Sequence, residues 1–256
     1  MKEIVRELPQ YDYLYLGDNA RAPYGTRSYE TVDRYTWECV QWFFKMNCPL
    51  VILACNTASA KALRNIQQVY LPKSYPNKKV LGVIRPTTEV IGTYTKSGKI
   101  GILATSGTVQ SESYPIEIQK FYPRLSVYQQ ACPVWVPLIE NQLLENPGTE
   151  YFVRNNIESL LNQAENIDTI LLGCTHYPLL KSTITKITGN TIQVISQGEI
   201  VAKSLAEYLQ RHLEIESLLT NGASRDFYTT DSTVEFDKNA RMFYGNPVKS
   251  KFAYFG

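Results

Sequence analysis

The sequence predicts an α/β protein of two pseudo-symmetric lobes, each a mostly parallel sheet flanked by helices, with a site in the cleft between them. Three observations lead to this prediction. Short apolar runs alternate with helical periodicities, one strand-and-cysteine pattern occurs twice, and a chain of 256 residues is long enough for two domains of ordinary size.

Six short runs rich in Val, Ile and Leu have the composition of strands that are buried on both faces, as in parallel sheets. They span residues 49–54, 78–84, 99–104, 125–130, 168–173 and 191–196. None of them approaches the ~20 apolar residues that a membrane-spanning helix requires, so we expect no membrane partner.

Helical periodicities fill the intervals between these runs. Ser28 can cap a first helix, whose apolar face carries Val32, Tyr35, Cys39, Val40 and Phe43. Other apolar faces are marked by Leu63, Ile66 and Tyr70, by Leu160 and Leu161, and by Ile200, Val201, Leu205 and Leu209. Strands that alternate with helices predict helices covering a mostly parallel sheet.

One pattern occurs in both halves of the chain: VILACNTASA at 51–60 and TILLGCTHYP at 169–178. Each is a hydrophobic strand, a small residue and a cysteine, followed by the expected start of a helix. The repeat indicates a duplicated unit, and we expect lobe A to comprise 1–85 plus 196–256 and lobe B to comprise 86–195.

The two cysteines are placed to meet a ligand, because ligands bind beyond the carboxyl ends of parallel strands, where Cys55 and Cys174 fall. A helix N-terminus lowers a thiol pKa from ~8.5 toward neutrality, so we expect two reactive thiols.

Charge and cysteine content limit the kinds of partner and the location that the sequence predicts. The net charge is +2, and no run of Lys and Arg suggests nucleic acid or an anionic membrane, so a small neutral or acidic ligand is expected. The N-terminus lacks the apolar core of a signal peptide. The five cysteines form no C-x-x-C pair, which favours reduced thiols and a cytoplasmic location. A metal site is not expected, because His176 alone offers too few ligands.

Several chemistries remain open for Cys55 and Cys174, including a buried structural role for each. A phosphatase loop is excluded, because Lys61 and Leu180 stand where its arginine would be. A hydrolase with Cys174 as nucleophile and His176 as base would leave Cys55 without a role. Two thiols on opposite sides of a carbon can invert it, one by removing a proton and the other by delivering one.

Five segments together resemble the aspartate/glutamate racemase superfamily, and within it the glutamate racemases: GDNARAPYG (17–25), ACNTA (54–58), ATSGTVQSESY (104–114), VPLIE (136–140) and GCTHYP (173–178). The resemblance implies a cofactor-independent, two-base interconversion of L- and D-glutamate that supplies D-glutamate for bacterial peptidoglycan. It also implies that Cys55 and Cys174 are the catalytic thiols. By the same resemblance, the groups that assist them are His176, Glu140 and Asp18. The residues that hold the substrate would be Tyr24, Gly25, Asn56, Thr57, Thr175 and His176.

The chain departs from that pattern in two places. The family has a strand and an Asp-Ser-Gly loop before the first helix, whereas this sequence begins directly with the helix-like MKEIVREL. If no residues precede Met1, the first lobe is expected to lack a strand and an active-site carboxylate, and activity is expected to be weak or absent. The hypothesis drawn from this departure is that the chain is truncated at its start. The second departure is ISQGE (195–199), from which little effect on chemistry is expected.

Alternatives to glutamate racemisation also follow from the sequence. The same thiols could act on aspartate, a single thiol could serve a decarboxylase, and an inactive form could act only in binding. A homodimer is expected, since that state is common in the resembling family.

Overall fold

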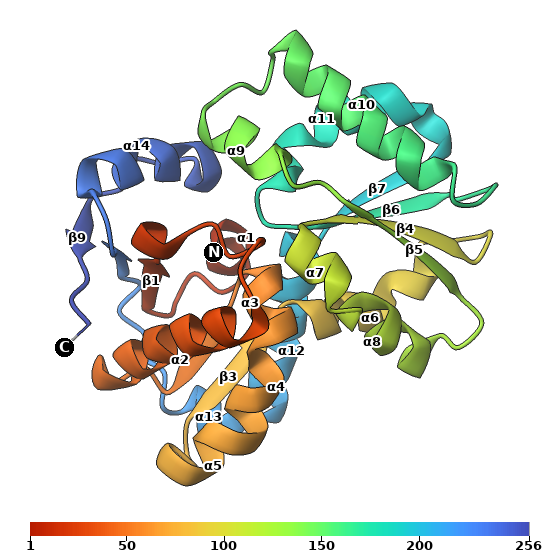
Figure 1. Cartoon of the computed structure of the whole chain (residues 1–256). Coiled ribbons are helices and arrows are strands. Elements are labelled where there is room, and N and C mark those ends of the chain that lie inside the picture. The colour runs from red at the N-terminus through yellow and green to blue at the C-terminus, as the bar shows by residue number, and fades with distance from the viewer. Residues whose placement is uncertain (256) are drawn as a thin grey trace.

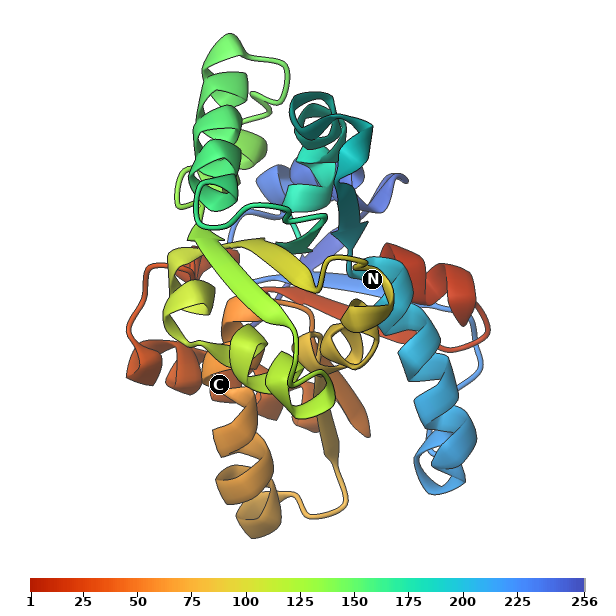
Figure 2. The same cartoon turned by 90° about the vertical axis from the view of Figure 1, so that its right-hand side faces the viewer.

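The structure, a computed structural model, describes residues 1–255. Its strands form three parallel sheets, with the orders β1-β8-β9, β2-β3 and β5-β4-β6-β7. The strands are β1 (Tyr13–Gly17), β2 (Leu50–Leu53), β3 (Lys79–Gly82), β4 (Lys99–Ala104), β5 (Ser126–Ala131), β6 (Thr169–Gly173), β7 (Gln193–Ser196), β8 (Arg225–Thr229) and β9 (Ser250–Phe252). Figures 1 and 2 show that the four-stranded sheet and its helices form one lobe and that the other two sheets lie in a second.

Helices connect and cover these sheets (Figure 1). The α-helices are α1 (Lys2–Glu7), α2 (Tyr29–Lys45), α3 (Asn56–Lys61), α4 (Leu63–Asn65), α5 (Leu71–Ser74), α6 (Ile84–Val90), α7 (Ser106–Gln110), α8 (Ser113–Phe121), α9 (Trp135–Glu140), α10 (Pro147–Leu161), α11 (Lys181–Thr188), α12 (Gly198–Arg211), α13 (Leu213–Glu216) and α14 (Thr233–Tyr244). Short 3-10 or π turns are η1 (Asn19–Arg21), η2 (Ile66–Tyr70), η3 (Ile91–Thr93), η4 (Tyr177–Leu180) and η5 (Gly189–Thr191). No helix among residues 1–255 is long and apolar enough to cross a membrane.

The central strands β4 and β6 of the four-stranded sheet are buried on both faces. Successive residues of a strand point to opposite sides, so each face can be followed along β6. Ile170 and Leu172 of β6 pack in one core with α9, α10 and α11. Leu171, between them, packs in a second core with α6 and α8. Both faces of β6 therefore need apolar side chains, which explains its uninterrupted apolar run.

The first lobe is built differently, since β2 and β3 pair with each other and β1 pairs with β8. Val51 and Leu53 of β2 pack beneath α2, while Leu50 and Ile52 pack in a cluster with α12 and Tyr13 of β1. Within residues 1–255 no strand ladder joins the two sheets. The predicted fold class, parallel sheets flanked by helices in two lobes, is confirmed, and in the first lobe the strands are divided between two sheets.

The six strands predicted from the apolar runs are confirmed as β2 to β7. The predicted first helix is confirmed as α2, and the Ser28 side chain accepts a hydrogen bond from the backbone N–H of Thr31. The helix-like N-terminal stretch is α1, which packs on α12. Strands β1, β8 and β9 were not predicted.

Candidate active site

Cys55 lies just beyond β2, where the chain turns from an extended conformation into α3. The backbone N–H groups of Thr57 and Ala58 and the Thr57 hydroxyl donate toward its sulfur. The residue is reachable by solvent, yet protein atoms surround the sulfur. Burial, and then the charge of Cys174, raise the pKa of the Cys55 thiol above its ordinary value despite these donors. The predicted lowering toward neutrality is therefore wrong for Cys55, because the desolvation penalty exceeds the effect of the helix start.

Cys174 follows β6 and is buried, with 8% of its surface exposed. The expected α-helix does not begin there. Thr175 is exposed, His176 caps the 3-10 turn η4, and α11 starts only at Lys181. Pro178 accounts for part of this difference, because it has no backbone N–H for a helical hydrogen bond.

A hydrogen-bonded chain runs from Cys174 to the surface. The Cys174 sulfur lies 3.9 Å from Nδ1 of His176, and Nε2 of His176 lies 3.0 Å from a carboxylate oxygen of Glu140 at the end of α9. Burial alone would lower the pKa of His176, but hydrogen bonds to Cys174 and Glu140, together with their charges, raise it to about 9. The ring of Phe243 packs edge-on against the imidazole at 5.0 Å.

The two thiols are close enough to interact electrostatically. A negative charge on Cys174 raises the pKa of Cys55, so the sulfurs are within electrostatic reach of one another. They come from different sheets, β2-β3 and β5-β4-β6-β7. Tyr15 of β1 also lies near, since its pKa is raised by burial and then by Cys55.

Three hydroxyl groups link the lobes beside Cys55. Thr57 lies 2.9 Å from Thr105 and 3.2 Å from Thr108, which are 3.1 Å from each other. Close by, the N–H of Gly107 donates to the carbonyl of Gly25 at 2.7 Å. A Cβ at Gly107 would come within 2.8 Å of that carbonyl oxygen, so this approach requires glycine.

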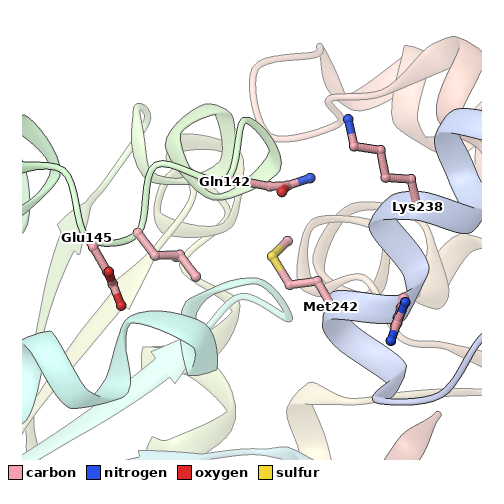
Figure 3. A pocket seen from close by; sticks show the side chains of 6 residues that line it. Gln142, Glu145, Lys238 and Met242 are labelled. Carbon is pink, nitrogen blue, oxygen red and sulfur yellow. The ribbon is translucent and has the colours of Figure 1, made fainter.

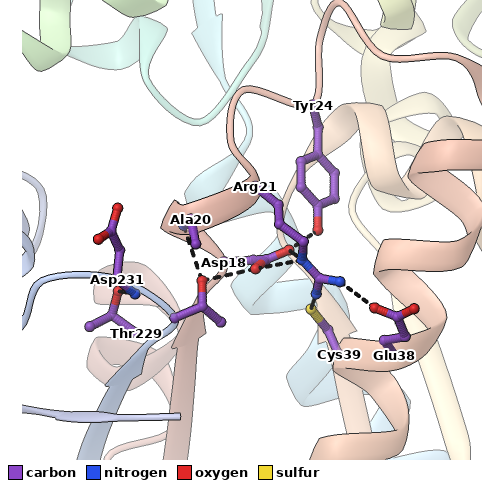
Figure 4. A network of polar contacts seen from close by, with 9 residues as sticks. Asp18, Ala20, Arg21, Tyr24, Glu38, Cys39, Thr229 and Asp231 are labelled. Atoms are coloured by element: carbon purple, nitrogen blue, oxygen red, sulfur yellow. Dashed lines mark hydrogen bonds and ion pairs between the residues drawn. The ribbon is translucent and has the colours of Figure 1, made fainter. Parts of the chain in front are cut away.

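The loop after β1 is held by Asp18 (Figure 4). Its carboxylate accepts hydrogen bonds from Nε of Arg21, from the hydroxyl of Tyr24 and, at 2.9 Å, from the hydroxyl of Thr230. Arg21 also bonds Glu38 and reaches the Cys39 sulfur at 3.4 Å. Asp18 thus fixes the loop that carries Tyr24 and Gly25, and its role as an assistant to a thiol stays a prediction.

Asn56 is almost fully buried next to Cys55, where its amide bonds Gln197 and Tyr114. Four residues near the predicted site were not singled out from the sequence: Thr105, Thr108, Tyr114 and Gln197. Three of these belong to the quoted segment 104–114, which follows β4 as the cysteines follow β2 and β6. The position of this segment after the end of β4 is the sequence feature that could have indicated these three residues.

A pocket of about 550 Å³, which neither thiol lines, lies between the segment after α9 and helix α14 (Figure 3). Its lining residues are Gln142, Leu144, Glu145, Lys238, Arg241 and Met242. No predicted site residue lines it. Within residues 1–255 no group of three or more His, Cys, Asp or Glu side chains is arranged to hold a metal ion.

The comparisons with known proteins agree with this geometry. The profile of the Asp/Glu/hydantoin racemase family matches residues 1–205. The glutamate racemase of Geobacter metallireducens is 36% identical, with 97% of this chain and 88% of that protein aligned. The glutamate racemase of Persephonella marina is 37% identical, over 96% of this chain and 89% of that protein.

Solved structures give the same result. Glutamate racemase RacE1 from Bacillus anthracis superposes with a TM-score of 0.87 at 34% identity, covering 98% of this chain and 91% of that one. The glutamate racemase of Francisella tularensis in complex with D-glutamate superposes with a TM-score of 0.86 at 28% identity, covering 99% of this chain and 92% of that one. The chain therefore belongs to the Asp/Glu/hydantoin racemase family.

Proposed function

We propose that this protein is a glutamate racemase that interconverts L- and D-glutamate, with Cys55 and Cys174 as its two bases. The observation that carries the proposal is the pair of electrostatically coupled thiols, which stand at the ends of strands from different sheets. The relatives described above, glutamate racemases at 36% and 37% identity, support glutamate as the substrate.

The reaction is a proton exchange at Cα. One sulfur, as thiolate, takes the Cα proton, and the electron pair of the broken C–H bond moves toward the α-carboxylate. The opposite sulfur, as thiol, gives its proton to the other face of the carbon, and a C–H bond of inverted configuration forms. The two sulfurs then have exchanged protonation states, so the proposal requires no cofactor.

The surroundings favour one starting arrangement. His176, with its pKa raised to about 9, is positively charged at neutral pH and faces the Cys174 sulfur. Cys55 has a raised pKa and is mainly a neutral thiol. Cys174 thus suits the base and Cys55 the acid in the first turnover. The bond from His176 to Glu140 gives the buried Cys174 a route for proton return to solvent.

Substrate binding uses the polar groups around the thiols. We assign to it the Asn56 amide, the hydroxyls of Thr57 and Thr175, and the loop residues Tyr24 and Gly25. Amide and hydroxyl donors match the carboxylates of a small acidic amino acid. In this proposal Asp18 acts indirectly, by holding the loop of Tyr24.

The test is racemisation of L-glutamate, followed by chiral chromatography, in wild type and in Cys55→Ser and Cys174→Ser variants. Both variants should lose racemisation, while each retains exchange of the Cα proton with deuterium from one enantiomer. Cys48→Ser is the matched control, because Cys48 is half-buried and precedes β2, whereas Cys55 follows the other end of that strand. Full racemase activity in both catalytic variants would refute the assignment. Activity on aspartate, loss of CO2 or binding without turnover would favour the alternatives.

The setting of this activity is also proposed. We expect a cytoplasmic homodimer that supplies D-glutamate for peptidoglycan, and light scattering after size exclusion tests the dimer. We assign 1–85 plus 196–256 to lobe A and 86–195 to lobe B. The four-stranded sheet supports that division, since its strands run from Lys99 to Ser196, one residue beyond the proposed end of lobe B.

A further inference from the structure

A buried cluster of four polar side chains lies behind Asn56. Its members are Asn56, Gln197, Tyr114 and Thr87, all with less than a tenth of their surface exposed. They come from the start of α3, the start of α12, α8 and α6. The amide oxygen of Gln197 accepts from Nδ2 of Asn56 at 2.8 Å, and its Nε2 donates to the hydroxyl oxygen of Tyr114 at 2.7 Å.

We propose that Gln197 is a positioning residue that fixes the orientation of the Asn56 amide beside Cys55 and ties together the two loops that carry the thiols. The inference rests on the proposed function for the role of Asn56 in binding glutamate. It concerns ISQGE, the segment from which little effect on the chemistry was expected.

The orientation follows from a backbone carbonyl. Nε2 of Gln197 lies 3.2 Å from the carbonyl oxygen of Val83, which can only accept a hydrogen bond. The nitrogen of the Gln197 amide must therefore face Val83, and its oxygen must face Asn56. Asn56 in turn must present its own nitrogen to Gln197, which leaves its oxygen for Tyr114.

The Tyr114 hydroxyl completes the circuit. It donates to the amide oxygen of Asn56 at 2.7 Å while it accepts from Gln197. Burial raises the pKa of Tyr114 above its ordinary value, so this hydroxyl keeps its proton. An amide nitrogen carries two N–H groups, so Asn56 has one beyond these bonds, and in this proposal that N–H binds a carboxylate of the substrate.

The same tyrosine connects the cluster to the second thiol. Its ring packs against Gly173, the residue before Cys174, so closely that a Cβ there would lie 3.2 Å from Cε2 of Tyr114. A charge on Cys174 also raises the Tyr114 pKa, after burial. The loop of Cys55 is thus bonded to Tyr114 through Asn56, and the loop of Cys174 is packed on it.

The experiment is a double-mutant cycle of Gln197→Met and Asn56→Ala, measured by racemase kinetics. Methionine keeps the size of the side chain but removes both hydrogen-bonding ends. A hydrogen bond to a charged group contributes about 1.5–3 kcal/mol, so we expect KM for glutamate to rise roughly tenfold or more in Gln197→Met, with a smaller change in kcat. In the Asn56→Ala background the same substitution should have almost no further effect on KM.

Gln193→Met is the matched control, because Gln193 is an exposed residue of the neighbouring β7. A purely structural role for Gln197 would lower the folded fraction and apparent kcat with an unchanged KM, and that result would overturn the inference. A KM effect that is equally large without Asn56 would also overturn it. If Gln197→Met does not fold, Tyr114→Phe replaces it in the cycle, with the same two outcomes. Absence of racemisation in wild type would instead contradict the proposed function.

Discussion

Replacing Glu140 by Gln should lower the pKa of His176 by about one pH unit. Burial opposes the charged imidazole, yet the partners Cys174 and Glu140 raise its pKa from 6.5 to about 9. A neighbouring opposite charge shifts a pKa by about 1–3 units. The Glu140 side chain is 43% exposed, so solvent screens it, and its share belongs at the low end of that range.

The assay is an NMR titration of the imidazole resonances. The sequence contains only two histidines, so each resonance can be assigned by its own variant. His212 lies 3.0 Å from Glu214, the same separation as in the His176–Glu140 pair. Glu214→Gln is therefore a matched control that should leave the His176 midpoint unchanged. An unchanged His176 midpoint in Glu140→Gln, or an equal shift in Glu214→Gln, would refute the reasoning.

Two other predictions concern the same charges. Because the pKa of His176 is raised in the folded state, its stabilising contribution is complete below pH 6.5 and is lost as the pH rises through about 9. The free energy of unfolding in urea should therefore decline between pH 6.5 and about 9. A decline of the same size in His176→Asn would show that it does not arise from the titration of His176. Cys174→Ser removes a charge that, after burial, raises the pKa of Cys55. Alkylation of Cys55 by iodoacetamide at neutral pH, followed by mass spectrometry, should accelerate in that variant, whereas an unchanged rate would mean that the thiols are uncoupled.

The sequence predicts those strands that are buried on both faces. All five residues of β6 are buried, so its apolar run is continuous and easily recognised. Strand β8 has only two buried residues and contains Arg225 and Asp226, and β9 has none. Such strands have no apolar pattern of their own, because their place in the sheet is set by pairing, of β8 with β1 and of β9 with β8, and by neighbouring helices.

The sequence predicts those parts of the candidate site that follow strand ends. The repeated pattern led to Cys55 and Cys174, and a charge on Cys174 influences the pKa of Cys55. Its electrostatics were not predictable in the same way. A helix start can be read from the sequence, but the burial that raises the Cys55 pKa depends on side chains from other elements, among them Tyr15 of β1.

Gln197 shows why part of a site escapes sequence reasoning. An amide at the start of a helix ordinarily indicates a solvated cap or turn, and nothing near residue 197 in the sequence indicates burial. Its partners Asn56, Tyr114 and Val83 are all more than eighty positions away along the chain. Each bond depends on the others, because the carbonyl of Val83 sets the direction of one amide and that amide sets the next. The role of Gln197 depends on the whole ring of hydrogen bonds among Asn56, Gln197 and Tyr114, which forms only after both lobes have folded together.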